Sequence, residues 1–318
     1  MDYAKGIGII IVVFAHLLRG IEGAGLLGGM PRDVFLSISS SCTVWSMPAF
    51  FFISGILYGR GLDKRHGAKE LAGKFDGIFY PYLIWSVITG LIEVASSGYR
   101  NGTSDLNSIY KVIWEPRGIF WFLYALFEAF LITEILIKFI GPAKSRLALL
   151  PISLAMLSTW GFGPLPMAIS ELQMSLVYFA IGLAISTKIS MEQRPSVWIG
   201  IVSILGVFGV LYASTMLFGI RTTSFRSVTP NATAIALVVL AFFMVFCYSL
   251  PRTGLDWLQA LGEKSMDIYL IHLLLIAPVR IFMQKALGLS DPLLFIIIGL
   301  PAGVFGSLFI AGILRRIN

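Results

Sequence analysis

The chain has 318 residues, of which 57% are hydrophobic and 13% charged, and its mean hydropathy is +0.85. About a quarter of the residues of an ordinary soluble domain are charged, so this composition indicates a polytopic membrane protein without a sizeable soluble domain. The net charge is +7, but the basic residues stand in short segments between apolar runs, where they orient a protein in the membrane. Nucleic-acid binding is therefore not expected.

Apolar windows of about 20 residues, the length that crosses a bilayer, predict one all-α membrane domain over residues 1–318 with ten transmembrane helices. We place these spans at 4–20, 42–59, 78–96, 118–140, 147–163, 171–187, 197–218, 232–250, 266–284 and 292–314. An even number of spans puts both termini on the same side. Most of the basic residues, including those of the 60–74 segment, then share that side, which predicts cytoplasmic termini in an inner membrane.

The first apolar run carries an acid, a base and a histidine, namely Asp2, Lys5 and His16. A helix with about 3.6 residues per turn places Lys5 and His16 on one face, about 16 Å apart along the axis. Asp2 lies still further from His16 and is expected to pair with Lys5. A histidine inside a span is usually functional, although a hydrogen bond between helices is an alternative. The run has no cleavage signal, so we expect it to remain as a helix.

Polar residues also interrupt the second and fourth spans. Ser54 and Gly55 follow Pro48 in an apolar run, which favours either the approach of a ligand or close helix packing. Trp121 and Tyr124 near the start of the fourth span are typical of a membrane-interface belt. Glu128 lies deeper, either as a packing partner or in a cavity. Cys42 and Cys247 both lie in apolar runs without the spacing of metal ligands, so we interpret each as a small packed residue and expect no metal.

The ninth span begins with Ser265, Tyr269 and His272 on one helical face. This stripe either orients a substrate and supports His16 or forms a hydrogen-bonded seam between helices. Two further segments, 96–113 and 219–231, are polar and lie on the predicted outer side. They are candidates for an acceptor site, and solvated loops are the alternative. The basic 60–74 segment also suits anionic membrane lipids.

Five short motifs occur in a fixed order across these spans and resemble the membrane-bound acyltransferase family 3, most closely its fucose 4-O-acetylase-like branch. They are DYAKGI at 2–7 with ten residues between Lys5 and His16, FFISG at 51–55, PYLIW at 81–85, WFL at 121–123 and IYLIH at 268–272. Two features differ from the family pattern. The arginine that often precedes the first motif lies upstream of this sequence or is missing, because Asp2 follows Met1. Lys74 is followed three positions later by Gly77, where the family tends to have a second basic residue.

The resemblance implies transfer of an acetyl group from cytoplasmic acetyl-CoA to a hydroxyl of a cell-surface carbohydrate or lipid-linked glycan. His16 is then the general base or an acyl-carrying nucleophile, and Asp2 belongs to the catalytic set through Lys5. Lys5, Lys74 and Arg65 or Lys69 would meet the phosphates of the donor. Tyr269, His272 or Ser54 would donate a hydrogen bond to the oxyanion, and Ser54 is also assigned to the donor site.

Two other classes of function fit ten spans with polar residues inside them. One is a transporter or flippase for a lipid-linked sugar, which has no need for a thioester donor. The other is a membrane scaffold or sensor that binds neither ligand productively. Binding of acetyl-CoA by the purified protein separates the acyltransferase from both. The sequence contains no pattern that identifies the acceptor sugar.

Overall fold

The computed structural model describes residues 1–95, 110–116, 118–159, 166–188, 194–218, 230–251 and 253–317. Within these ranges the chain is helical, with short turns and no strand, which confirms the predicted all-α fold. The predicted outer segments 96–113 and 219–231 lie mostly outside the described residues. The chain divides into two compact units, one formed by Met1–Ala49 with Gln193–Asn318 and the other by Phe50–Glu192.

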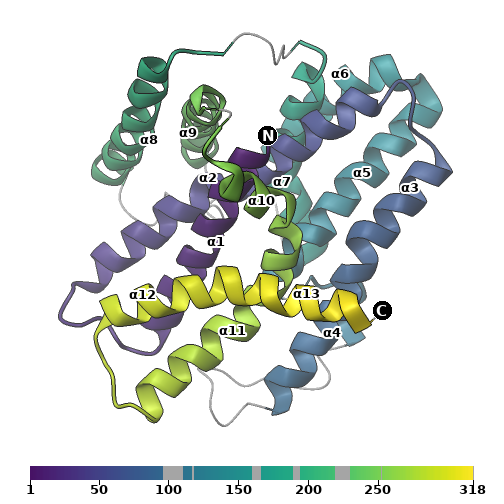
Figure 1. Ribbon diagram of the computed structural model, residues 1–318. Coiled ribbons are helices and arrows are strands. Elements are labelled where there is room, and N and C mark those ends of the chain that lie inside the picture. The colour runs from purple at the N-terminus through teal and green to yellow at the C-terminus, as the bar shows by residue number, and fades with distance from the viewer. Residues whose placement is uncertain are drawn as a thin grey trace. The chain divides into compact units, whose positions relative to one another are not determined.

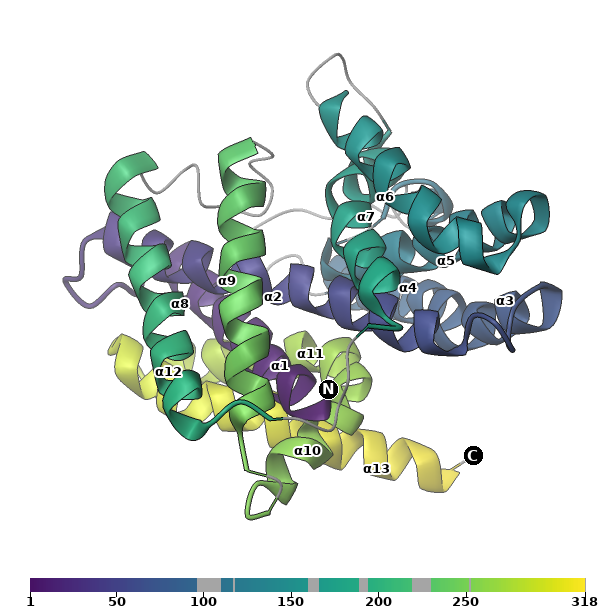
Figure 2. The same cartoon turned by 90° about the horizontal axis from the view of Figure 1, so that it is seen from above.

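The first unit contains the first part of α2 (Arg32–Gly61), the helix before it, and the helices from α8 to the C-terminus (Figure 1). Its other helices are α1 (Asp2–Gly23), α8 (Val197–Phe218), α9 (Pro230–Ser249), α10 (Asp256–Glu263), α11 (Ser265–Lys285), α12 (Pro292–Pro301) and α13 (Ser307–Ile317). A π-helical turn over Ala302–Gly306 joins α12 to α13, and the two helices follow one line in Figure 1. Helices α8 and α9 lie side by side in both views (Figures 1 and 2).

The second unit contains the rest of α2 and the helices up to α7. They are α3 (Ala68–Lys74), the π-helical turn Phe75–Phe79, α4 (Tyr80–Ala95), two short 3₁₀ turns at Tyr110–Ile113 and Gly118–Phe120, α5 (Trp121–Ile140), α6 (Pro142–Ser158) and α7 (Met167–Ile185). Gly141, with φ of 77°, ends α5, and Pro142 starts α6 directly after it. This order uses the freedom of glycine past a helix end and the fixed φ of proline at a helix start.

Eight helical segments in the described residues are long and apolar enough to cross a membrane. They are Asp2–Gly23, Arg32–Gly61, Ala68–Ala95, Tyr110–Ile140, Val197–Leu217, Ala232–Ser249, Ser265–Lys285 and Pro292–Arg316. Each coincides with one of the ten predicted spans. At the other two predicted positions the structure has α6, with 17 residues, and α7, whose apolar part is Ile169–Ile185. Both are near the lower length limit for a span. The length and composition of the described helices therefore support eight spans and do not confirm the other two.

Helix α1 is the core of the first unit because small residues allow other backbones to approach it. A Cβ added to Gly6 would collide with the Leu258 carbonyl of α10, and one added to Gly262 would collide with the carbonyl of Asp2. Gly303 makes room for two side chains, those of Val13 of α1 and Ile276 of α11. Close backbone packing at small residues is the usual way in which membrane helices associate. It fixes the start of α1 beside α10, which immediately precedes α11.

Candidate functional site

The two histidines predicted from separate helices meet inside the first unit. The ring of His16 on α1 and the ring of His272 on α11 have centroids 5.3 Å apart, with planes inclined by 44°. His272 is fully buried, and His16 is half-buried. Both lie within candidate membrane spans. The two rings are therefore in contact, as expected if the ninth span supports His16.

The backbone determines which nitrogen of His272 carries a proton. Nδ1 lies 3.0 Å from the carbonyl oxygen of Ile268 and 2.8 Å from that of Tyr269. Carbonyl oxygens only accept hydrogen bonds, so Nδ1 must be the donor. In the neutral ring Nε2 is then an acceptor, and this buried atom has no hydrogen-bond partner among the described residues. A buried lone pair without a partner is costly, and the ring of His16 packs against the ring that carries it.

The other residues of the predicted stripe on α11 have different surroundings. Tyr269 is buried, its ring centroid is 6.2 Å from that of His272, and its carbonyl holds the His272 ring. Ser265 is the first residue of α11 and is half-buried. The tyrosine therefore belongs to the histidine cluster, whereas the serine stands at the helix start, about 10 Å along the axis from His272.

Lys5 and Asp2 form the expected ion pair at the start of α1, with Lys5 Nζ 2.6 Å from Asp2 Oδ1. Asp2 lies about 21 Å from His16 along the helix axis. The carboxylate is therefore placed to hold the lysine and not to contact the imidazole. Any catalytic effect of Asp2 must act through Lys5.

Arg19 was not predicted as a site residue. It stands one turn after His16 on α1, is exposed, and interacts electrostatically with His16 and with Cys42 of α2. The two predicted packed cysteines are both free thiols, Cys42 half-buried and Cys247 buried. A basic residue one turn from a histidine in the same span is the sequence signal that would have identified Arg19.

The second unit contains a pocket of about 280 Å³ that unites three predicted donor-site residues. Ser54 comes from α2, Arg65 from the turn that follows α2, and Lys74 from the end of α3. Apolar side chains of α5, among them Phe130, complete the wall. These three residues are up to twenty positions apart in the sequence, and they line one pocket, to which Arg65 and Lys74 contribute basic side chains.

The ammonium group of Lys74 has three neighbours in this pocket. Its Nζ lies 3.1 Å from Glu70 Oε1, 5.6 Å from the ring centroid of Tyr58 and 5.0 Å from that of Phe130. Aromatic faces attract a cation within about 6 Å, so the two rings hold the ammonium group at the pocket wall. The sequence prediction missed both rings, although Tyr58 stands one helical turn after Ser54.

Glu134 of α5 fastens the turn between α2 and α3 that carries Arg65. Tyr58 donates a hydrogen bond to its Oε1, and the backbone N–H of Gly67 donates to its Oε2 at 2.6 Å. Gly67 has φ of 88°, a conformation that favours glycine, and directly precedes α3. The buried carboxylate therefore ties α5 to both helices that form the pocket.

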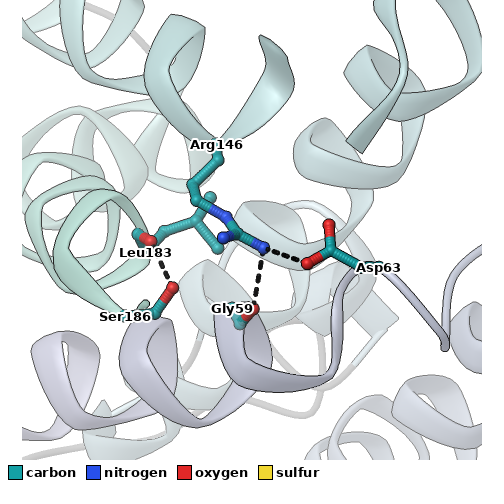
Figure 3. A network of polar contacts seen from close by, with 5 residues as sticks. All are labelled: Gly59, Asp63, Arg146, Leu183 and Ser186. Carbon is teal, nitrogen blue, oxygen red and sulfur yellow. Dashed lines mark hydrogen bonds and ion pairs between the residues drawn. The ribbon is translucent and has the colours of Figure 1, made fainter. Parts of the chain in front are cut away.

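Arg146 of α6 fixes the end of α2 from another direction (Figure 3). Its Nη2 donates at 3.1 Å to the Gly59 carbonyl and at 3.1 Å to Asp63 Oδ2. Gly59 packs against the side chain of Ser186, which itself bonds to the Leu183 carbonyl. A cation is favourable at a helix C-terminus, where carbonyls have no partner in the helix. This network fixes the end of α2, where Tyr58 and Gly61 line the pocket.

The predicted belt and cavity residues of α5 are packed inside the second unit. Trp121 is 9% exposed and stacks on Phe51 at 6.3 Å, so its interpretation as an interface residue was wrong. Tyr124 donates a hydrogen bond of 3.0 Å to the carbonyl of Ile113. Glu128 has one buried carboxylate oxygen, Oε2, that has no hydrogen-bond partner among the described residues.

A second pocket, of about 400 Å³, lies between α3 and α5 and has Glu134 in its lining. Its lining is mainly apolar and includes Leu71, Leu131 and Ile135, with His66 and Lys138 as the basic residues. An apolar wall beside basic groups suits an acyl chain and an anionic headgroup. Within the described ranges no group of three or more His, Cys, Asp or Glu side chains is arranged to hold a metal ion.

Comparison with known proteins gives a family match over nearly the whole sequence. The sequence model of the family described as "Acyltransferase domain" matches residues 1–312. Nodulation protein NolL of Mesorhizobium japonicum is 24% identical over 193 residues, which are 60% of this chain and 48% of that protein. Nodulation protein NolL of Sinorhizobium fredii is 26% identical over 165 residues, 48% of this chain and 42% of that protein. The chain thus spans about half the length of these curated relatives. No solved structure matches it.

Proposed function

Because the chain belongs to acyltransferase family 3, we propose that it is an integral membrane O-acetyltransferase. It moves an acetyl group from cytoplasmic acetyl-CoA to a hydroxyl of a cell-surface carbohydrate or lipid-linked glycan. The observation that carries this proposal is the contact between His16 and His272 inside membrane-spanning helices. Residues 1–318 act as one catalytic domain in an inner membrane, with both termini in the cytoplasm.

His16 performs the chemistry, and His272 is its positioning residue. With Nδ1 of His272 committed to two backbone carbonyls, its Nε2, which has no partner among the described residues, is the acceptor that we assign to the N–H of His16 during the reaction. The other nitrogen of His16 is then left unprotonated towards the substrate. A base oriented by a fixed acceptor is the logic of catalytic triads. Tyr269, whose ring lies beside His272, donates to the developing oxyanion.

The reaction balances with His16 as general base. The imidazole takes the proton of the acceptor hydroxyl while the hydroxyl oxygen attacks the thioester carbonyl carbon. A tetrahedral oxyanion forms and collapses, the C–S bond breaks, and the imidazolium returns the proton to the CoA thiolate. In the nucleophilic route the unprotonated nitrogen of His16 attacks first and carries the acetyl group to the acceptor. Trapping of an acetylated His16 without acceptor distinguishes the two routes.

The donor is held through its phosphates by Lys74, Arg65 and Lys5, with Ser54 contributing a hydroxyl. Support comes from the basic pocket that contains Ser54, Arg65 and Lys74. Lys5 and Lys74 are each paired with a carboxylate on their own helix. Such partly exposed pairs contribute only about 0–1 kcal/mol, so a doubly charged phosphate displaces the carboxylate.

The main test uses the purified protein in lipid nanodiscs and follows CoA release from acetyl-CoA with candidate acceptors. A fucosylated lipo-oligosaccharide is the first acceptor to assay, because of the likeness to the fucose 4-O-acetylase-like branch. His16→Ala should lower kcat by about 10²–10⁴-fold, the usual contribution of a positioned base, while acetyl-CoA still binds. Normal turnover of this variant would refute the mechanism. A wild-type protein that binds no acetyl-CoA would point instead to a transporter or flippase.

A matched set of variants tests the donor site. Lys74→Met should weaken acetyl-CoA binding at least several-fold, because a phosphate loses its charge partner. Glu70→Gln removes the carboxylate that competes for Lys74 and should tighten binding by about 1.5–5-fold, the worth of one exposed ion pair. Lys5→Ala should weaken binding with less effect on kcat. Calorimetry with a non-hydrolysable acetyl-CoA analogue measures all three. Unchanged affinity in Lys74→Met would remove this pocket from the donor site.

A further inference from the structure

Arg280 is a buried cation in the first unit that the proposed mechanism does not use. It lies in the span Ser265–Lys285 and is 9% exposed. Its Nη1 donates to Gln284 Oε1 at 3.3 Å, and within the described part of the chain no carboxylate pairs with it. A guanidinium group has five donors, so most of its hydrogen-bonding capacity is unused. A charged group inside a membrane span without a counter-ion is costly and indicates a functional site.

The position of Arg280 relative to His16 follows from Gly20. The side chain of Arg280 crosses α1 at this glycine, where an added Cβ would lie 3.7 Å from Arg280 Nε. Gly20 comes four residues after His16, on nearly the same helical face and about 6 Å further along the axis. Lys5 lies in the opposite direction along this face. The arginine therefore stands one turn beyond the histidine, on the side away from the proposed donor phosphates.

We propose that Arg280 binds the phosphate of a lipid-linked saccharide acceptor. The fork of a guanidinium group matches phosphate oxygens in pairs, and its burial in a span selects a phosphate that a lipid brings into the membrane. Held there, the phosphate supplies the missing counter-charge and keeps the attached sugar within one helical turn of His16. The inference rests on the proposed acyl transfer, because it assigns the acceptor class to the same site.

Binding of a defined lipid tests the site without any measurement of transfer. The probes are undecaprenyl phosphate and, as the uncharged control, undecaprenol, each titrated against the full-length protein in nanodiscs and detected by native mass spectrometry. The wild-type protein should bind the phosphate at least tenfold more tightly. Arg280→Met should abolish this preference, and Arg280→Lys, which keeps the charge but loses the fork, should reduce it. Arg32→Met is the matched control, because exposed Arg32 already pairs with Glu22 at 2.6 Å.

Competition with inorganic phosphate distinguishes a lipid-borne group from a free ion. If 10 mM inorganic phosphate, roughly a cellular level, does not displace undecaprenyl phosphate, the result supports the proposal. Displacement by the free ion would overturn the lipid assignment, and equal affinity of the wild type for both lipids would overturn the site. If Arg280→Met does not fold, Arg280→Lys decides alone, and an unchanged preference in it contradicts fork recognition. His16→Ala should retain the preference, so a failure of the catalytic proposal is visible separately.

Discussion

His272 presents two ring nitrogens to very different surroundings. Nδ1 is held by the carbonyl oxygens of Ile268 and Tyr269, and Nε2 is buried without a partner in the described residues. The backbone bonds determine both the tautomer and the ring orientation, so Nε2 is a fixed acceptor beside His16. A group that hydrogen-bonds one nitrogen of a catalytic histidine determines which nitrogen faces the substrate.

Substitutions of His272 that keep one nitrogen at a time test this arrangement. Gln places an acceptor near the position of Nε2, whereas Asn preserves only a donor near Nδ1. We expect His272→Asn to lower kcat by about 10–100-fold, corresponding to a charge-assisted hydrogen bond of about 1.5–3 kcal/mol. His272→Gln should retain most of the activity. The measurement is kcat and KM for acetyl-CoA together with thermal unfolding.

A purely structural histidine predicts another result. If Asn and Gln lowered kcat equally and in proportion to lost stability, His272 would be a packing residue and not a positioning residue. The KM for acetyl-CoA should stay constant in both variants, because the proposed donor phosphates contact other residues.

The crossing of α2 and α7 is determined by glycines on both helices. A Cβ on Gly55 would collide with the Phe179 carbonyl of α7, and one on Gly182 would collide with the Phe52 carbonyl of α2. The obstacles are backbone atoms, which cannot rotate away as a side chain can. This close approach brings Tyr58 and Phe130 to Phe179, at ring distances of 6.2 and 5.2 Å. The aromatic wall of the pocket that contains Lys74 thus depends on a helix crossing.

Alanine at one of these positions should therefore be destabilising. We expect Gly182→Ala to lower the free energy of unfolding by about 1–3 kcal/mol, the usual cost of overpacking, and to weaken acetyl-CoA binding. Gly209→Ala in α8 is the control, because its Cβ would have no atom within 4 Å and alanine is favoured over glycine in a helix by about 0.5–1 kcal/mol. Unfolding in detergent measures both. Equal stability of the two variants would contradict the close crossing.

At the scale of the molecule, the number of membrane crossings depends on α6 and α7. Helix α6 and the apolar part of α7 are each about 17 residues long, close to the shortest length that spans a bilayer. If both cross, the chain has ten spans, and if both stay on one side it has eight. The termini share a side in either case. The end of α6 is the point at which the two topologies differ.

Cysteine labelling in intact cells should resolve the topology. In a background without Cys42 and Cys247, we introduce single cysteines at the exposed residues Met30, Lys64 and Ser158. Met30→Cys should react with an impermeant maleimide from outside, and Lys64→Cys should react only after permeabilisation. Labelling of Ser158→Cys from outside indicates ten spans, and labelling only after permeabilisation indicates eight. External reaction at Lys64→Cys would invert the predicted orientation.

The sequence by itself determined the fold class, eight of the span positions and the chemical nature of the candidate site. These features are local: an apolar run of sufficient length must be a helix in a bilayer, and helical periodicity places Lys5 and His16 on one face. The Lys5–Asp2 ion pair could be predicted for the same reason, since one helical turn separates the two residues. The ordered motifs also identified the family correctly.

Contacts between distant helices were decided only by the tertiary structure. Helical periodicity cannot show that His272 meets His16, that Tyr58 and Phe130 hold Lys74, or that Arg280 crosses α1 at Gly20. Each of these depends on which helices pack together and at which glycine. In a membrane protein nearly every helix is apolar, so hydrophobic pattern alone does not choose partners. The choice is made by small residues and by buried polar groups that must find one another.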